Sequence, residues 1–252
     1  MTTTTETSQT MQALRIELEG EVTSFRYPHF MWGIQPTFEM PPPATIYGHI
    51  CSAVGTWISP ASVRFAYHFT HRGTFTDLEH IHTDSTVAAA TPRQRQRYVG
   101  QGYEDVRRCG ESSVIPFSRE LLFRPRLVLY LDRPDLAPAF RSPHYAVVLG
   151  RSQDLCAYPP RAVQVVTLEW RERVYYEHTL LPLAMARHIE RGVTVFMPRY
   201  IAYEQGRRPH FAQYLMLNER ECPASGPAWC DPAAPEVRGH GRAVVWHTFV
   251  DE

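Results

Sequence analysis

The sequence predicts an α+β protein: a ferredoxin-like (RRM-like) domain with an inserted arginine-rich hairpin and a small β-rich C-terminal region. Three observations support this class. Strand and helix patterns follow one another in the order strand, helix, strand, strand, helix, strand. Roughly fifty residues, far more than an ordinary connection, separate the second strand pattern from the third. The last third of the chain contains only short strand-like pieces divided by Gly, Pro and Arg.

The first two elements follow from their periodicity. After a Thr-rich tail over residues 1–11, which we expect to be disordered, the apolar side chains of ALRIELE alternate with polar ones, as in a strand. Three prolines then precede a helical pattern in which Ile46, Ile50 and Trp57 share a face. Pro43 suits the first helical turn, because its missing N–H costs nothing there. The backbone N–H groups of the residues after Pro43 are free at a helix start, so they could bind an anion. The alternative is that the prolines only initiate the helix.

A strip of small residues, Gly48, Ser52 and Gly55, lies along another side of this helix. Glycine destabilises a helix interior by up to about 1 kcal/mol. We therefore expect that another backbone or a nucleotide comes close here, or that the helix packs tightly on a sheet. The residues alone leave these alternatives open.

Further strands follow the helix. Phe65, Tyr67 and Phe69 share one face of a second strand, residues 121–131 form one long third strand, and residues 162–170 form a fourth. The predicted regions are a ferredoxin-like domain over 12–172, an insertion at about 84–118 within it, and a β-rich region over 173–252.

Composition narrows the class of protein. The 252 residues are 44% hydrophobic, enough for a substantial core. No apolar run approaches the ~20 residues of a membrane span, and the first residues lack the pattern of a secretory leader. The five cysteines are odd in number and contain no CxxC, which favours reduced thiols. We expect a cytoplasmic protein without membrane association.

The net charge is zero, but the basic residues are concentrated. All 26 are arginines, and the chain contains no lysine. Between residues 91 and 126 lie eight arginines and four acidic residues, a local charge of +4. Guanidinium groups bind phosphates and base edges through forked pairs of N–H donors, which would explain the use of arginine by its function. The alternative is a bias in codon usage that replaces lysine by arginine throughout a proteome. The absence of lysine excludes any mechanism that needs a lysine from this chain.

Two segments carry side chains of the kinds that contact nucleic acid. SFRYPHF combines aromatic rings with a guanidinium group, the groups that stack on bases and bind phosphates, and Arg26 and Tyr27 are the best candidates in it. In PRQRQRY, an extended backbone would place Arg93, Arg95 and Arg97 on one side, about 6 to 7 Å apart. A solvated charged loop is the alternative for these arginines.

Neither candidate metal site is convincing. His68, His71, His80 and His82 lie within fifteen residues but lack a carboxylate or cysteine partner at ligand spacing. The second set, Cys222, Cys230, His240 and His247, has spacings that miss the usual zinc pattern. We expect no metal and no cofactor.

Five segments, in order, resemble the CRISPR-associated Cascade subunit-five family of the RAMP superfamily. They are ALRIELEGEVTSFRYP, QPTFEMPPPATIYGHICSAVG, SRELLFRPRLVLYL, YAVVLGRSQDL and GRAVVWHTF. The resemblance covers nearly the whole chain from residue 12 and is greatest to subtype I-B and related subtypes. It implies a ribonucleoprotein subunit of antiviral defence that caps the 5′ handle of the guide RNA (crRNA), with the insertion at about 84–118 as a protruding thumb.

The resemblance also implies partners and site residues. The partners are the crRNA 5′ handle, a Cascade backbone subunit and the large subunit, with target DNA near the protospacer-adjacent motif left open. The predicted RNA-binding residues are Ser24, Arg26, Tyr27, His29, Thr45, Tyr47, Arg93, Arg95, Arg97, Arg107, Arg108 and Arg119.

We expect the chain not to be an enzyme. One branch of the same family cleaves the guide precursor with tyrosine, lysine and histidine, and this chain offers Tyr47 and histidines but no lysine. A metal-independent endoribonuclease of that kind is one alternative function. The other is a free-standing ferredoxin-like RNA-binding protein outside any complex.

Overall fold

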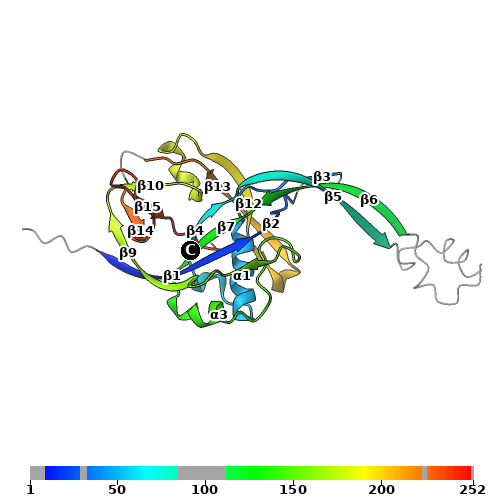
Figure 1. The fold of residues 1–252 in the computed structure, drawn as a ribbon, viewed down its shortest axis with the longest axis horizontal. Helices are drawn as coiled ribbons and strands as arrows, with labels where there is room; N and C mark the ends of the chain where they lie inside the picture. Colours follow the sequence, from blue (N-terminus) through cyan, green and yellow to red (C-terminus); the bar gives the residue numbers. More distant parts are fainter. Residues whose placement is uncertain (1–8, 29–32, 85–111, 223–225, 251–252) are drawn as a thin grey trace, which may run out of the picture. The chain divides into compact units, whose positions relative to one another are not determined.

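The computed structural model describes residues 9–28, 33–84, 112–222 and 226–250. The fold is a mixture of α and β structure that is rich in sheet (Figure 1). The strands are β1 (Thr10–Gly20), β2 (Val22–Thr23), β3 (Ile34–Gln35), β4 (Phe65–Thr70), β5 (Gly73–Asp84), β6 (Ser112–Phe123), β7 (Arg126–Leu131), β8 (Cys156–Ala157), β9 (Val163–Arg171), β10 (Val174–Tyr175), β11 (Thr179–Pro182), β12 (Val193–Ala202), β13 (Arg208–Leu217), β14 (Ala228–Cys230) and β15 (Gly241–Val244). The α-helices are α1 (Pro43–Val54) and α3 (Ala137–Arg141), and the 3₁₀ turns are η1 (Pro60–Ser62), η3 (Pro134–Leu136), η4 (Leu183–Arg187) and η5 (Tyr203–Gln205).

The chain divides into two compact units. One comprises residues 1–25, 38–74 and 122–252, and the other comprises residues 26–37 and 75–121. We call them the main unit and the arm unit. The part of the chain expected to form the insertion includes residues 85–111, which lie outside the described residues.

The main unit is built on one large sheet with the strand order β10-β15-β14-β9-β1-β7-β4, and β8 pairs with the end of β1. Neighbouring strands in the series β9, β1, β7 and β4 are antiparallel. A separate three-stranded sheet has the order β11-β13-β12. Strands β14 and β15, which come from the region expected to be an appendage, therefore extend the same sheet as β1.

Strict alternation along β1 creates the core face of this sheet. Leu14, Ile16 and Leu18 are at most 3% exposed and stand opposite leucines of β7 in register. Phe65 and Phe69 continue this apolar face across β4, as their spacing predicted. Burying a side chain of this size stabilises the fold by roughly 1.5 to 3 kcal/mol.

The other face of the sheet carries a smaller apolar cluster. Ala13, Ala66, Tyr130, Leu168 and Val244 are buried together there. The Tyr130 hydroxyl donates a hydrogen bond of 2.8 Å to the buried Asp231 carboxylate. Val244 belongs to β15 and Asp231 directly follows β14, so the C-terminal strands contribute to this face.

Helix α1 begins at Pro43 and ends at Val54, and the next residue, Gly55, has a φ of 85°, the left-handed conformation that glycine adopts without strain. Ile46 and Ile50 face the core as predicted, with no exposed surface. The expectation for Trp57 is wrong, because the residue lies beyond the end of the helix and is 49% exposed.

The expectation of one strand over 121–131 is also wrong. Arg124 has a φ of 50°, and Pro125 after it has no N–H to donate to a sheet. The chain therefore breaks between β6 and β7. In the described residues, no helix is long and apolar enough to cross a membrane.

Two buried histidines hold parts of the main unit together. His49 of α1 contacts the Val148 carbonyl through Nδ1 at 3.1 Å and the Tyr158 hydroxyl through Nε2 at 3.0 Å. His247 contacts the Leu180 carbonyl through Nε2 at 3.0 Å. Burial lowers the pKa of each ring to about 4. Both histidines are therefore neutral in the folded protein at neutral pH.

The neutral histidines predict a loss of stability in mild acid. The ordinary pKa near 6.5 returns on unfolding, so the unfolded state binds more protons between about pH 6.5 and pH 4. Stability is complete above pH 6.5 and falls as the pH falls. We expect His49 and His247 each to contribute a loss of about 2 kcal/mol between pH 7 and pH 5. Urea unfolding at the two pH values measures it, and His49→Gln should reduce the difference; an identical pH dependence in that variant would contradict the assignment.

Candidate nucleic-acid interface

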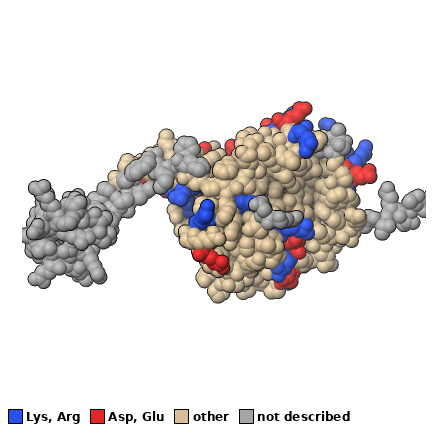
Figure 2. Space-filling model, turned by 180° about the vertical axis from the view of Figure 1, so that it is seen from behind, with Lys and Arg blue, Asp and Glu red and all other residues tan. Residues whose placement is uncertain are grey.

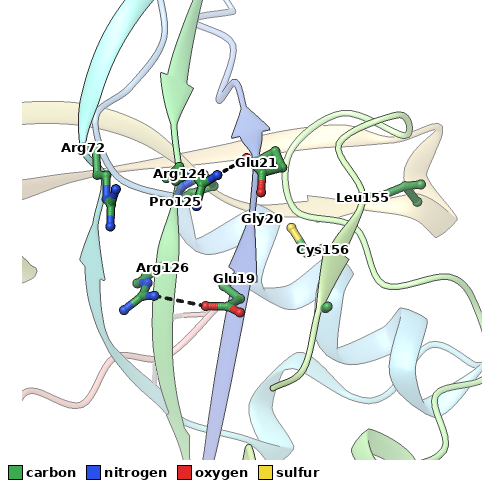
Figure 3. A pocket seen from close by; sticks show the side chains of 10 residues that line it. Glu19, Gly20, Glu21, Arg72, Arg124, Pro125, Arg126, Leu155 and Cys156 are labelled. Carbon is green, nitrogen blue, oxygen red and sulfur yellow. Dashed lines mark ion pairs between the residues drawn. The ribbon is translucent and has the colours of Figure 1, made fainter. Parts of the chain in front are cut away.

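A pocket at one end of the main sheet gathers three arginines. Figure 3 shows Arg72, Arg124 and Arg126 side by side, with Glu19 and Glu21 next to them. We call this site the arginine pocket. Its volume is about 400 Å³. Its complete lining is Glu19, Gly20, Glu21, Arg72, Arg124, Pro125, Arg126, Leu155, Cys156 and Ala157.

Backbone hydrogen bonds fix the strand ends that carry these side chains. The Gly20 N–H donates to the Pro125 carbonyl at 3.1 Å, and the Arg124 N–H donates to the Glu21 carbonyl at 2.8 Å. The Arg72 N–H donates to the Phe123 carbonyl at 2.8 Å. The break between β6 and β7 is therefore paired on both sides, which maintains the left-handed conformation of Arg124.

The ion pairs within the pocket are loose. The guanidinium of Arg124 lies 3.3 Å from Glu21, and that of Arg126 lies 3.4 Å from Glu19. Charge-assisted hydrogen bonds are usually 2.7 to 2.9 Å long. All four side chains are at least 47% exposed, so each pair stabilises the protein by at most about 1 kcal/mol. Among the described residues, the Arg72 guanidinium has no ion-pair partner.

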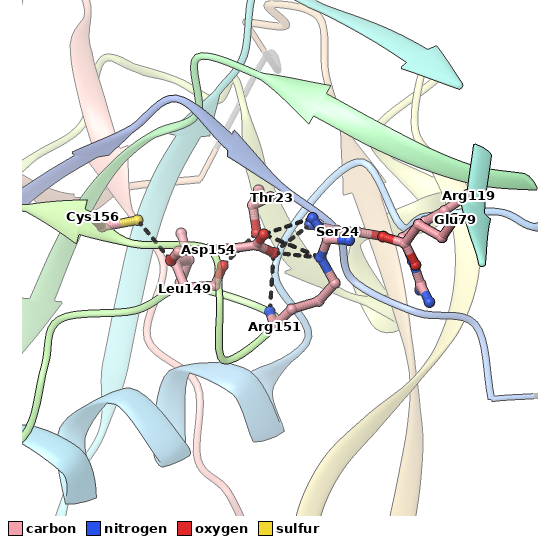
Figure 4. A network of polar contacts seen from close by, with 8 residues as sticks. All are labelled: Thr23, Ser24, Glu79, Arg119, Leu149, Arg151, Asp154 and Cys156. Atoms are coloured by element: carbon pink, nitrogen blue, oxygen red, sulfur yellow. Dashed lines mark hydrogen bonds and ion pairs between the residues drawn. The ribbon is translucent and has the colours of Figure 1, made fainter. Parts of the chain in front are cut away.

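One wall of the arginine pocket is held by the buried carboxylate of Asp154, which is 1% exposed (Figure 4). Its Oδ2 accepts hydrogen bonds from the Ser24 N–H at 3.2 Å and the Arg151 N–H at 3.1 Å. The Arg151 guanidinium also donates to Oδ1 at 2.8 Å. One carboxylate thus closes the loop over residues 149–154 and attaches it to the segment after β2. Leu155 and Cys156 of the pocket directly follow this loop.

Close packing of the same loop depends on Gly150. Its φ is 94°, and a Cβ there would lie 2.5 Å from the Thr23 Oγ1 and 2.8 Å from the Ser24 carbonyl oxygen. The Thr23 hydroxyl donates to the Leu149 carbonyl. On the other side, Cys156 packs against Gly20, and burial raises the pKa of its thiol to about 11. The thiol is therefore protonated at neutral pH.

A second cavity, of about 210 Å³, shares Glu19 and Arg126 with the arginine pocket and reaches His68 and Arg242 on the outer face of the sheet. Burial, together with the positive charge of Arg242, lowers the pKa of His68 to about 3. The imidazole is therefore neutral at pH 7, and the arginines supply the positive charge of this face. In the described part of the chain, no group of three or more His, Cys, Asp or Glu side chains could hold a metal ion.

Three predicted site residues lie in the main unit. Ser24 and Tyr47 are each 2% exposed, and the Tyr47 hydroxyl donates to the Ile58 carbonyl at 2.6 Å. The Thr45 N–H donates to the Pro42 carbonyl at 2.8 Å. The Ile46 N–H also bonds to the Pro42 carbonyl, at 3.3 Å, as at the start of any α-helix, so the anion site stays a prediction. Contact of RNA with the Ser24 or Tyr47 side chain would require a local rearrangement.

The strip of small residues on α1 differs at its two ends. A Cβ at Gly48 would meet nothing within 4 Å, whereas one at Gly55 would lie 2.5 Å from the His144 ring. The close approach expected at Gly55 is therefore a contact with a side chain of this protein. Gly48 faces open space.

Three further predicted residues lie in the arm unit. The backbone of the exposed Arg26 pairs with Thr37. The carbonyl oxygen of half-buried Tyr27 accepts a hydrogen bond of 3.1 Å from Gln35. Arg119 donates through Nε to Glu79 at 2.7 Å, a pair visible in Figure 4, and through Nη1 to Gln35 at 3.3 Å. The Arg119 guanidinium is therefore already engaged.

The remaining predicted residues, His29, Arg93, Arg95, Arg97, Arg107 and Arg108, lie outside the described residues. Sequence reasoning did not select Arg72, Arg124 or Arg126 as site residues. Arg124 and Arg126 belong to the basic stretch, and the FRPR sequence with its proline was the available signal. Nothing in the sequence around Arg72 distinguishes it from an ordinary surface arginine.

Figure 2 shows positive and negative side chains close together on the described surface, separated by large uncharged areas. This distribution agrees with the paired arginines of the main unit. On this face, no large area of one sign stands out among the residues that the structure describes.

No family model and no curated protein matches the chain. Among solved structures, the chain is similar to one described as "CRISPR RNA-guided surveillance complex", with a TM-score of 0.50 and 14% identity over 86% of this chain and 91% of that one. A "CRISPR-associated Protein" matches with a TM-score of 0.36 and 12% identity over 87% and 98% of the two chains. A "Cas protein" matches with a TM-score of 0.38 and 14% identity over 83% and 94%. The first likeness shows a shared fold, and the two lower TM-scores carry no argument.

Replacing Asp154 tests how the pocket wall is held. Asp154→Ala leaves the Arg151 guanidinium and the Ser24 N–H without their acceptor, and removing one partner of a buried pair costs about 3 to 5 kcal/mol. We expect a loss near the lower end, because 17% of the Arg151 side chain is exposed. Asp135→Ala, which breaks the exposed pair with Arg133, is the control and should cost under about 1 kcal/mol. Equal losses in urea unfolding of the two variants would contradict this assignment.

Proposed function

We propose that the chain is a non-catalytic RNA-binding subunit of a type I CRISPR interference complex (Cascade) in the cytoplasm. In this proposal it caps the 5′ handle of the crRNA and links the backbone and large subunits. The observation that carries the proposal is the arginine pocket, because clustered, accessible guanidinium groups are the groups that bind an RNA backbone. The five segments that resemble the Cascade subunit-five family supply the context.

The strand order supports a ferredoxin-like core for this protein. Strands β1, β4, β7 and β9 follow the expected succession along the chain, and they are arranged as β9-β1-β7-β4 with antiparallel neighbours. Helix α1 lies between β1 and β4 in the sequence, and α3 lies between β7 and β9. The fold shared with a chain of a CRISPR RNA-guided surveillance complex is consistent with this proposal.

The predicted thumb remains part of the proposal. Strands β5 and β6 pair with each other on either side of residues 85–111. Arg93, Arg95 and Arg97 would contact handle phosphates or a neighbouring backbone subunit. Arg26 and Tyr27 provide an exposed guanidinium and a half-buried ring near the start of the arm unit.

A free-standing RNA-binding protein, the alternative function, would differ in how it binds RNA and in how much apolar surface it exposes. Such a protein would bind RNA as tightly alone as among other proteins, whereas a capping subunit exposes apolar surfaces for its neighbours and binds RNA more weakly without them. Exposed apolar side chains favour a subunit: Trp57, Tyr145 and Phe196 are 49%, 59% and 50% exposed.

Replacing the pocket arginines tests the RNA contact. Arg72→Gln, Arg124→Gln and Arg126→Gln together should weaken RNA binding at low salt and reduce the salt slope by about 0.7 for each of these arginines that contacts a phosphate of a single strand. A matched control replaces three exposed arginines elsewhere, Arg141, Arg191 and Arg207, with glutamine. Anisotropy titrations with labelled repeat RNA measure both variants. The pocket is not the RNA site if the two variants have the same slope.

The non-catalytic role predicts that the purified chain leaves repeat RNA intact. Burial raises the pKa of Tyr47 far above its ordinary value, so its hydroxyl stays protonated and bonded to Ile58. A buried phenol in this state is a poor general base. Labelled precursor RNA should remain full length after incubation with wild type or Tyr47→Phe. Cleavage by the wild type that Tyr47→Phe abolishes would establish the endoribonuclease alternative.

A further inference from the structure

The carboxylates of the arginine pocket are unexpected in a site for RNA phosphates. Glu19 and Glu21 line the pocket beside the three arginines. A carboxylate repels a phosphate, so a pocket that served phosphate alone would be weakened by both side chains. The ligand that suits the whole lining has acceptor groups for the arginines and hydrogen-bond donors for the glutamates.

We propose that the arginine pocket binds a guanine base of the RNA, with a glutamate on its N1–H and N2–H₂ donors and an arginine on its O6 and N7 acceptors. This inference rests on the proposed RNA-binding function. Guanine is the nucleobase that presents two adjacent N–H donors to one carboxylate. Arginine bonded to O6 and N7 is the commonest specific contact to guanine.

The pocket has room for a nucleotide. Its volume of about 400 Å³ lies in the range of small-ligand sites, roughly 300 to 1,000 Å³. Leu155 in its lining is 66% exposed, an apolar surface that a base plane can cover. The wall that bears Leu155 is fixed by Asp154 and by the contact between Gly20 and Cys156.

The charged groups are available to such a ligand. The pairs Arg124–Glu21 and Arg126–Glu19 are longer than normal charge-assisted hydrogen bonds, and their side chains are accessible. A base can therefore insert between partners without breaking a strong interaction. Arg72 has no ion-pair partner in the described residues and suits the adjoining phosphate.

The test compares four RNA octamers that carry fluorescein at the 3′ end: U8 and U8 with one internal guanine, adenine or cytosine. The full chain is titrated with each, followed by anisotropy. We expect the single guanine to tighten binding about tenfold relative to adenine or cytosine, within the range for one good bidentate contact. Arg72→Gln should weaken all four octamers by a similar factor and keep the preference.

The double variant Glu19→Gln with Glu21→Gln removes the carboxylates while keeping side-chain size. It should reduce the preference for guanine to less than about twofold and bind U8 at least as tightly as the wild type, because two negative charges are lost. The matched control, Glu172→Gln with Glu190→Gln, changes two exposed glutamates outside the pocket and should keep the preference. Circular dichroism establishes that both variants are folded.

Three results would overturn the inference. Equal binding of all four octamers would show that the chain does not distinguish guanine from the other bases, and the proposed RNA-binding function would stand. A guanine preference that survives in the Glu19/Glu21 variant would place base recognition elsewhere on the chain. Failure to bind any octamer and any repeat RNA would reject the proposed function itself.

Discussion

The buried carboxylate of Asp154 connects two segments that are 130 residues apart in the sequence. It accepts hydrogen bonds from the backbone of Ser24 and from both the backbone and the guanidinium of Arg151. The loop before β8 and the chain after β1 therefore keep a fixed separation. The arginine pocket forms between these segments and the break from β6 to β7, so its shape depends on this one group.

The arginine pocket combines a fixed wall with adjustable charges. The hydrogen bonds of Asp154 are made by a buried carboxylate, and two of them hold backbone N–H groups in place. The pairs of Arg124 and Arg126 are exposed and long, and they hold their side chains weakly. A rigid wall lowers the entropic cost of binding, because less of the protein must be ordered by the ligand. Weak internal pairs allow the guanidinium groups to turn toward a phosphate or a base.

Much of the fold could be predicted from local patterns. The alternation in residues 14–18 and 63–69 identified β1 and β4, and the prolines located the start of α1. The break inside 121–131 escaped prediction because apolar residues continue on both sides of it, and only the backbone shows the left-handed Arg124. Trp57 was assigned to the helix because its spacing fits, although Gly55 ends the helix first.

The site was harder to predict for a physical reason. Its arginines come from two places in the chain, Arg72 and the segment 124–126, and each resembles an ordinary surface charge until the sheet brings the strand ends together. The aromatic and basic character of residues 24–27 was visible in the sequence, but not that Ser24 is buried and that its N–H donates to Asp154, far along the chain. Chemistry that depends on such long-range contacts is not encoded in any local spacing.

Ultraviolet crosslinking of the chain to its co-purified RNA, with mass spectrometry of the crosslinked peptides, tests the central claim most directly. We expect peptides that contain Arg72 and residues 124–126 to carry nucleotides from the repeat-derived 5′ end of the RNA. Crosslinks confined to the 3′ end of the RNA, or to peptides that contain none of the pocket residues, would contradict the account.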